Sequence, residues 1–164
     1  MNPRIFTNRI EQCHKQYLAD TLDLTVSNFG IDLINDQIGI ELKCRYVKYP
    51  INFAVHYYQI ELFRNLSPSK ELYWAFLVYD LKKDISKINE NILEYDLEKL
   101  VYDRRVWLLE WDWINQFSVS EAKTGPYVYV HNDDLKKEKF VSYKSNNGMF
   151  NFCKGSGIEK MIRS

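Results

Sequence analysis

The stretch IDLINDQIGIELKCRY, residues 31–46, decides the fold because it joins a strand pattern to charged side chains. Apolar residues recur at every second position from Ile38 to Tyr46, which is typical of a strand with one apolar face. The polar break Asn35-Asp36-Gln37 precedes this strand and favours a turn. We therefore expect two strands, 29–34 and 38–48, that form a hairpin.

The register of this hairpin follows from its turn. With the tip at Asp36 and Gln37, residue 34 faces 39 and residue 33 faces 40. Asp32 then faces Glu41, with the two Cβ atoms about 5 Å apart. Alternation places four residues on the face opposite the apolar one: Gly39, Glu41, Lys43 and Arg45.

Two facing carboxylates destabilise a sheet unless a positive charge lies between them. Mg²⁺ fits this position because it binds one or two carboxylates together with water and phosphate oxygens. An amine beside the ion, here Lys43, is suited to orient a metal-bound water and to stabilise charge on a phosphoryl group. The alternative is a solvated hairpin face on which Lys43 pairs with Glu41 or Asp32.

The composition is that of a globular protein. The chain has 164 residues, of which 46% are hydrophobic and 27% charged, and we expect a single domain spanning residues 1–164. The N-terminus lacks an apolar signal core, so we expect a cytoplasmic location and no membrane association. The three cysteines lie far apart, which favours reduced thiols.

The rest of the chain predicts an α/β domain with a mixed sheet. Residues 84–100 favour short helical pieces, and the tryptophan-rich body of 105–113 favours a strand that belongs to the core or to a dimer surface. The remaining expected elements are helices at 8–22 and 52–64, a fully buried strand at 72–81, a strand after Gly125-Pro126, a turn at Asn146–Gly148 and a last short helix after Gly157.

Asp32 followed after eight residues by Glu41-Leu42-Lys43 resembles the motif of the PD-(D/E)XK nuclease superfamily. The resemblance covers residues 5–81 and implies a restriction-endonuclease-like core, a central mixed β-sheet flanked by helices. It departs from the family pattern before the first acid, where Gly30-Ile31 stands and the proline is missing.

The resemblance also implies roles for single residues. Asp32, Glu41 and the Leu42 carbonyl would hold Mg²⁺, for which Mn²⁺ would substitute, and Lys43 would activate the attacking water. Glu11 on the first helix would support the metal shell, and Gln59 on the helix after the triplet would contact the site. Arg45, on the same face as Glu41 and Lys43, is expected to bind a backbone phosphate of the DNA, with a solvent-exposed strand arginine as the alternative. His56 is expected near the site, with a surface or core position as the alternative.

Charge is unevenly distributed along the chain. Residues 1–134 hold 15 Lys and Arg against 20 Asp and Glu, whereas residues 135–164 hold seven against two. We expect this basic segment to contact the phosphates of double-stranded DNA, with a solvated tail as the alternative. Its candidate DNA-binding residues are Lys136, Lys137, Lys139, Lys144 and Lys154.

These observations predict a Mg²⁺-dependent DNA endonuclease. Near-zero net charge favours a sequence-specific cutter such as a type II restriction endonuclease, and cutting both strands favours a homodimer. The same motif also suits a homing endonuclease, a Holliday-junction resolvase or a repair nuclease. An inactive relative that only binds nucleic acid is the alternative outside enzymes.

Overall fold

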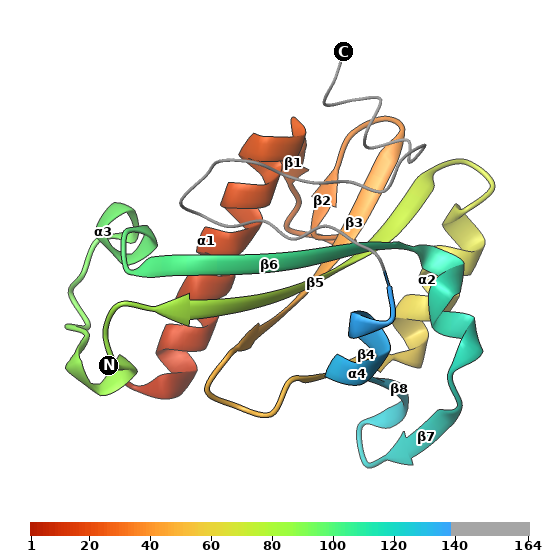
Figure 1. Cartoon of the computed structure of the whole chain (residues 1–164). Helices are drawn as coiled ribbons and strands as arrows, with labels where there is room; N and C mark the ends of the chain where they lie inside the picture. Colours follow the sequence, from red (N-terminus) through yellow and green to blue (C-terminus); the bar gives the residue numbers. More distant parts are fainter. Residues whose placement is uncertain (139–164) are drawn as a thin grey trace.

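The structure, a computed structural model of the chain, describes residues 1–138. Its helices and strands follow one another in a mixed order (Figure 1). They are α1 (Pro3–Leu22), β1 (Thr25–Val26), β2 (Leu33–Ile34), β3 (Ile38–Tyr46), β4 (Asn52–His56), α2 (Tyr57–Leu66), β5 (Glu71–Leu81), the 3-10 helix η1 (Ile85–Lys87), α3 (Glu94–Glu98), β6 (Val101–Glu110), the 3-10 helix η2 (Trp111–Gln116), β7 (Val119–Ala122), β8 (Gly125–His131) and α4 (Asn132–Lys136).

Two sheets organise these elements. The larger sheet has five strands in the order β1-β2-β3-β5-β6. Strands β3 and β5 pair in parallel, and the other neighbouring strands of this sheet pair antiparallel. The smaller one is antiparallel, with the order β4-β8-β7. The expected α/β class with a mixed sheet is therefore confirmed.

The five-stranded sheet is covered on both faces by different elements. Helix α1 lies across one face, as Figure 1 shows, and its apolar side packs against Ile40, Leu42 and Leu77. Helix α2 and the smaller sheet contribute to a second core with Trp74 and Phe76 on the other face. Strand β5 is consequently buried on both sides along most of its length, as its continuous apolar run predicts.

The first helix is longer than expected. It begins at Pro3 rather than at residue 8, because Asn2 caps it by accepting a hydrogen bond from the Arg4 amide. Thr7 and Asn8 consequently lie within the helix and do not cap it. Pro3 suits a first helical position, where no N–H bond is lost.

The expected helix at 52–64 is wrong in its first part. Residues 52–56 form β4, because Phe53 and Val55 point into the core while Ala54 between them is exposed. Pairing with β8 satisfies the backbone of this segment, and the helix begins only at Tyr57. This change turns the segment before α2 into one wall of the site described below.

The other elements differ mainly in their ends. Of the expected strand 29–34, only residues 33 and 34 pair with β3, and the strand expected at 105–113 runs from Val101 to Glu110. Trp111 and Trp113 lie in η2 and pack against the second core, which confirms their core placement. The helical pieces expected at 84–100 are present as η1 and α3, and the expectations at 146–148 and after residue 157 lie outside the described residues.

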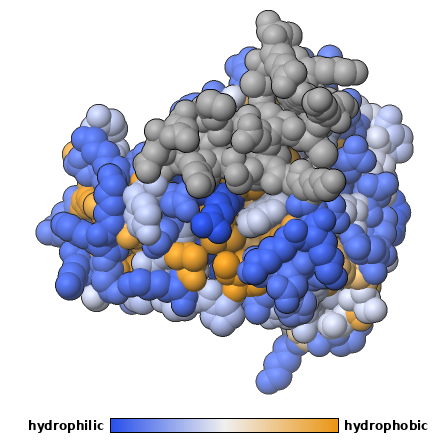
Figure 2. Space-filling view, in the orientation of Figure 1, coloured by the Kyte–Doolittle hydropathy of each residue, from blue (hydrophilic) through white to orange (hydrophobic). Residues whose placement is uncertain are grey.

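The face seen in Figure 2 is mostly hydrophilic, and its apolar side chains gather in a band through the middle. In the described part of the chain, no helix is both long enough and apolar enough to cross a bilayer. Cys13 and Cys44 are free thiols.

Candidate active site

The hairpin formed by β2 and β3 has the predicted register. Leu33 pairs with Ile40 and Ile34 pairs with Gly39. Asp32 lies one residue before β2, and its Oδ2 accepts a hydrogen bond of 2.9 Å from the Leu42 amide. Since a strand residue directs its N–H and C=O to the same side, the Leu42 carbonyl points to this same edge of β3. The first acid is therefore fixed beside the triplet.

A glycine lets the chain that carries Asp32 approach β3 closely. A Cβ atom on Gly39 would lie 2.9 Å from Leu72 Cδ2 and 3.1 Å from Ile31 Cδ1. Ile31 is buried and directly precedes Asp32. Gly39 therefore provides the space in which Ile31 packs, and this packing helps to place the neighbouring carboxylate.

Glu41, Lys43 and Gln59 form a connected group on the face of β3 that lies opposite α1. Lys43 Nζ donates to Gln59 Oε1 at 2.9 Å and lies 3.4 Å from Glu41 Oε1. Gln59 Nε2 donates to the same Glu41 oxygen at 2.5 Å. The structure thus brings Gln59, from helix α2, into contact with both charged residues of the triplet.

A second lysine, which the sequence reasoning missed, joins the site from α1. Lys15 Nζ lies 2.7 Å from Asp32 Oδ1 and 3.0 Å from Glu11 Oε1. The Glu11–Lys15 spacing of four residues was a visible signal for a helical ion pair, but it gave no sign that Asp32 shares the amine. Glu11 therefore reaches the site through Lys15.

The two acids differ in their surroundings. Glu41 is only 7% exposed, and burial followed by the charge of Asp32 raises its pKa to about 7, although Lys43 opposes this rise. Burial alone would lower the pKa of Lys15, but its bonds to Asp32 and Glu11 outweigh burial and raise it. Lys43 does lie beside Glu41, but Glu41 is buried, so this face of the hairpin is not simply a solvated surface.

Glu11, Asp32, Glu41 and Lys43 line one cleft of about 290 Å³ between β3 and the smaller sheet, and Lys15 and Gln59 contact these residues from outside the cleft lining. Asn52, Ala54 and Tyr129 form its wall on the side of the smaller sheet. The cleft brings together five of the residues singled out from the sequence, namely Glu11, Asp32, Glu41, Lys43 and Arg45, with Leu42 between the second acid and the lysine.

The remaining candidates lie elsewhere. His56 precedes α2 and stacks on Tyr58, with 5.5 Å between the ring centroids, and it does not line the cleft. Lys136 and Lys137 lie at the end of α4, away from the cleft lining, and Lys136 is exposed and within 4.0 Å of Asp133. Lys139, Lys144 and Lys154 lie outside the described residues.

The donors in the cleft fit a hard divalent cation. Two carboxylates and one main-chain carbonyl offer oxygen atoms only, and Mg²⁺ completes such a set with water. Burial and the charge of Asp32 raise the pKa of Glu41, and a cation held between the two acids would offset their mutual repulsion. Within residues 1–138 no group of three or more His, Cys, Asp or Glu side chains forms a metal site, so the ion would depend on Asp32, Glu41 and the Leu42 carbonyl.

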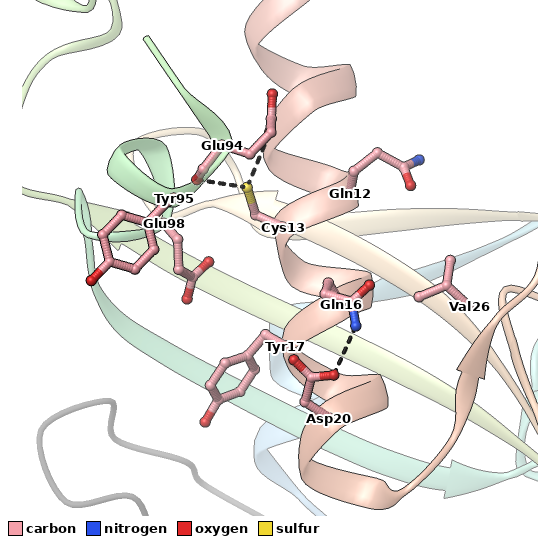
Figure 3. A pocket seen from close by; sticks show the side chains of 9 residues that line it. All are labelled: Gln12, Cys13, Gln16, Tyr17, Asp20, Val26, Glu94, Tyr95 and Glu98. Atoms are coloured by element: carbon pink, nitrogen blue, oxygen red, sulfur yellow. Dashed lines mark hydrogen bonds between the residues drawn. The ribbon is translucent and has the colours of Figure 1, made fainter.

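A larger cavity of about 430 Å³ lies between α1 and α3 (Figure 3). Arg9 pairs with Glu94 and Arg104 pairs with Glu98 at this cavity, and its third acid, Asp20, accepts a hydrogen bond from Gln16. Burial raises the pKa of the Cys13 thiol to about 12, so this sulfur is a poor nucleophile. The smaller cleft, which both Asp32 and Glu41 line together with Lys43, is the better candidate for chemistry.

Comparison with known proteins identified no relative: no family model matches the chain, and no curated protein matches it.

Proposed function

We propose that this protein is a Mg²⁺-dependent DNA endonuclease. The proposal rests on one observation: Asp32, Glu41 and Lys43 line a single cleft, although the two acids come from different segments of the chain. The buried position of Glu41 and its hydrogen-bonded contact with Gln59 support it, because a solvated surface pair would show neither.

The arrangement of the elements also supports a restriction-endonuclease-like core. Helix α1 is followed by the hairpin, by β4 and α2, and by the buried strand β5, which pairs in parallel with β3. This is the order that the resemblance implies for residues 5–81, with β4 as an added strand. We therefore propose this fold for the central sheet and its helices.

Each cleft residue has a role in the proposed reaction. When bound, Mg²⁺ would supply Lewis acidity to a phosphate oxygen and to a water molecule. Asp32, Glu41 and the Leu42 carbonyl would hold it, and Lys43 would orient the attacking water and stabilise negative charge on the phosphate. Gln59 fixes Lys43 and Glu41, and Lys15 holds Asp32 in place through its 2.7 Å contact.

DNA binding would use positive charge near the cleft. Arg45 lines it, and among residues 1–138 its hydrogen-bond partners are the neutral oxygens of Pro50 and Asn52, which leaves the charge available for a phosphate. Double-stranded DNA, a homodimer and the phosphate contacts of the basic segment remain proposals, as does the choice among restriction, homing, junction-resolving and repair roles.

The test is cleavage of mixed plasmid and phage DNA by the wild type, Glu41→Ala and Lys43→Ala with Mg²⁺, Mn²⁺ or EDTA. We expect cutting by the wild type with either metal and none with EDTA. Both variants should be inactive and folded by circular dichroism. Discrete bands would indicate a restriction enzyme, and selective cutting of four-way junctions would indicate a resolvase. A wild type inert on every DNA form, or full activity of Lys43→Ala, would refute the proposal.

A further inference from the structure

The outward face of the smaller sheet carries a row of aromatic rings along β8. Tyr127, Tyr129 and His131 alternate with Val128 and Val130, which are buried in the second core. Because alternate residues of a strand share a face, the three rings project together away from the core. Successive ring centroids lie 5.1 and 5.7 Å apart, and the rings of the second pair are nearly parallel.

This aromatic row borders the cleft that holds the acids. Tyr129 pairs across the sheet with Ala54, and both residues line the cleft together with Glu41 and Lys43. The small side chain of Ala54 leaves the space beside the tyrosine ring open. A group that enters this part of the cleft therefore meets the Tyr129 ring, which is 39% exposed, on its way to the acids.

Further features extend the row at both ends. His56 pairs with Tyr127 across the sheet and stacks on the exposed Tyr58. At the other end, Asn52 pairs with His131 and accepts a hydrogen bond of 3.1 Å from Arg45 Nη2. The guanidinium that carries the available positive charge thus lies beside the end of the row.

The chemistry of this face favours nucleobases over an apolar protein segment. The outward positions of β4 and β8 hold Tyr, His, Asn, Ala and Gly, and none holds Leu, Ile, Val or Met. Exposed rings with polar atoms stack on bases of any sequence, and a nearby cation holds the sugar-phosphate backbone. Bases inside an intact duplex are already stacked on their neighbours, so only unpaired bases can use such a surface.

We propose that the aromatic row binds unpaired bases of DNA, with Tyr129 stacking on a base next to the phosphate that enters the cleft. This inference rests on the proposed function and narrows its substrate to DNA that contains single-stranded nucleotides at the cleavage point. It favours a structure-selective role in junction resolution or repair over cutting of an uninterrupted duplex.

The test measures binding without catalysis. Fluorescence anisotropy in EDTA compares three labelled DNAs of equal length: a thymidine single strand, a full duplex, and a duplex with a single-stranded arm. We expect the wild type to bind the first and third at least 10-fold more tightly than the full duplex. Tyr129→Ala should weaken binding of the two single-stranded forms about 10-fold and leave duplex binding unchanged.

Two further variants keep this test independent of folding defects. Tyr129→Trp should restore binding because it retains a stacking ring, and Ala54→Leu should weaken binding because it fills the space beside Tyr129. Tyr95→Ala is the matched control, since Tyr95 is an exposed tyrosine on α3 that lines the other cavity. Circular dichroism spectra should be alike for all four variants.

Equal binding of single strand and duplex by the wild type would overturn the inference, and so would equal losses on both DNAs in Tyr129→Ala. Cleavage with Mg²⁺ on the same DNAs separates this failure from that of the proposed function. If Tyr129→Ala cleaves the duplex with a single-stranded arm as fast as the wild type does, the aromatic row does not bind unpaired bases, but the nuclease proposal stands. If single-strand binding depends on Tyr129 but no DNA is cleaved, the proposed base binding by the aromatic row stands and the proposed nuclease activity is wrong.

Discussion

Two polar clusters are built around helix α1, and they handle their charges in opposite ways. The buried cluster consists of His14, Tyr17, Glu98 and Arg104. The cleft cluster consists of Glu11, Lys15, Asp32, Glu41, Lys43 and Gln59. Both clusters combine cations with carboxylates, but only the second places two acids close together in an open cleft.

The buried cluster gives Arg104 a hydrogen-bond partner at each of its three nitrogen atoms. Its guanidinium bonds both carboxylate oxygens of Glu98, donates from Nε to His14 Nδ1 at 3.0 Å, and lies 4.1 Å from the centroid of the Tyr17 ring. Arg104 is only 2% exposed, so these contacts replace water around the charge. Such an arrangement stabilises one conformation of the Arg104 side chain.

The cleft cluster is held in place without being neutralised at every group. Asp32 forms an ion pair with Lys15. Glu41 lies beside Lys43, but the Lys43 amine also donates to Gln59, and burial and the charge of Asp32 raise the pKa of Glu41. A carboxyl group in a cleft whose pKa is perturbed by burial and by a second acid is typical of a functional site. The comparison teaches that the pairing of charges, more than their number, separates a structural cluster from a candidate active site.

The largest expected effect comes from Glu41→Gln, which keeps the shape of the side chain and removes its charge. We expect cleavage with Mg²⁺ to fall about 10³-fold, because a metal-held group contributes several kcal/mol to the transition state. The free energy of unfolding at pH 8 should stay the same or rise, because a buried charge beside Asp32 is removed. Plasmid cleavage and urea unfolding measure the two effects, with Glu61→Gln on the exposed side of α2 as the control. A large loss of stability together with activity would make Glu41 a structural residue.

Arg104→Ala should show the reverse pattern. Loss of the guanidinium leaves His14 and Glu98 without their partner, and we expect the free energy of unfolding to fall by about 3 kcal/mol. Cleavage measured well below the melting temperature should change less than threefold. Arg105→Ala is the control. The Arg105 side chain is next in the sequence and exposed, so this substitution should change the free energy of unfolding by less than about 0.5 kcal/mol. If a folded Arg104→Ala protein no longer cleaves DNA, the buried cluster is also required for activity and the two clusters act as one functional unit.

The hairpin was predictable from the sequence because it depends on local alternation and on one turn. The pairing of residue 33 with 40 and of 34 with 39 follows from these alone, and so does the placement of Glu41 beside Lys43. Lys15 was not predictable, because its contact with Asp32 depends on how α1 crosses the sheet. Strand β4 was missed since its partner, β8, lies about 75 residues further along the chain, and short-range periodicity carries no information on such pairing.

A smaller effect is expected from Gly39→Ala, which tests how the cleft cluster is positioned. The added methyl group would press on Ile31 and Leu72, so we expect a loss of about 1–2 kcal/mol in stability. Displacement of Ile31 should shift Asp32 and lower cleavage about 10-fold. The double variant Gly39→Ala/Ile31→Val, which removes the Cδ1 atom, should recover part of the activity. If Gly39→Ala cuts DNA as fast as the wild type, close packing at this position does not control Asp32.

The smallest expected effect is the pH dependence of stability that His14 of the buried cluster contributes. Burial and the charge of Arg104 hold the pKa of His14 well below its ordinary value of 6.5. The unfolded chain therefore takes up a proton at pH 6.5 while the folded chain does not, so the stability that His14 contributes is complete above that pH and falls as the solution becomes more acidic. Between pH 7.5 and 5.5, urea unfolding should show that the wild type loses about 1 kcal/mol more than His14→Gln, whose amide does not titrate. Parallel curves for the two proteins would mean that His14 accepts a proton in the folded state. The buried cluster would then accept an added positive charge in the folded state, a property that we propose only for the cleft cluster.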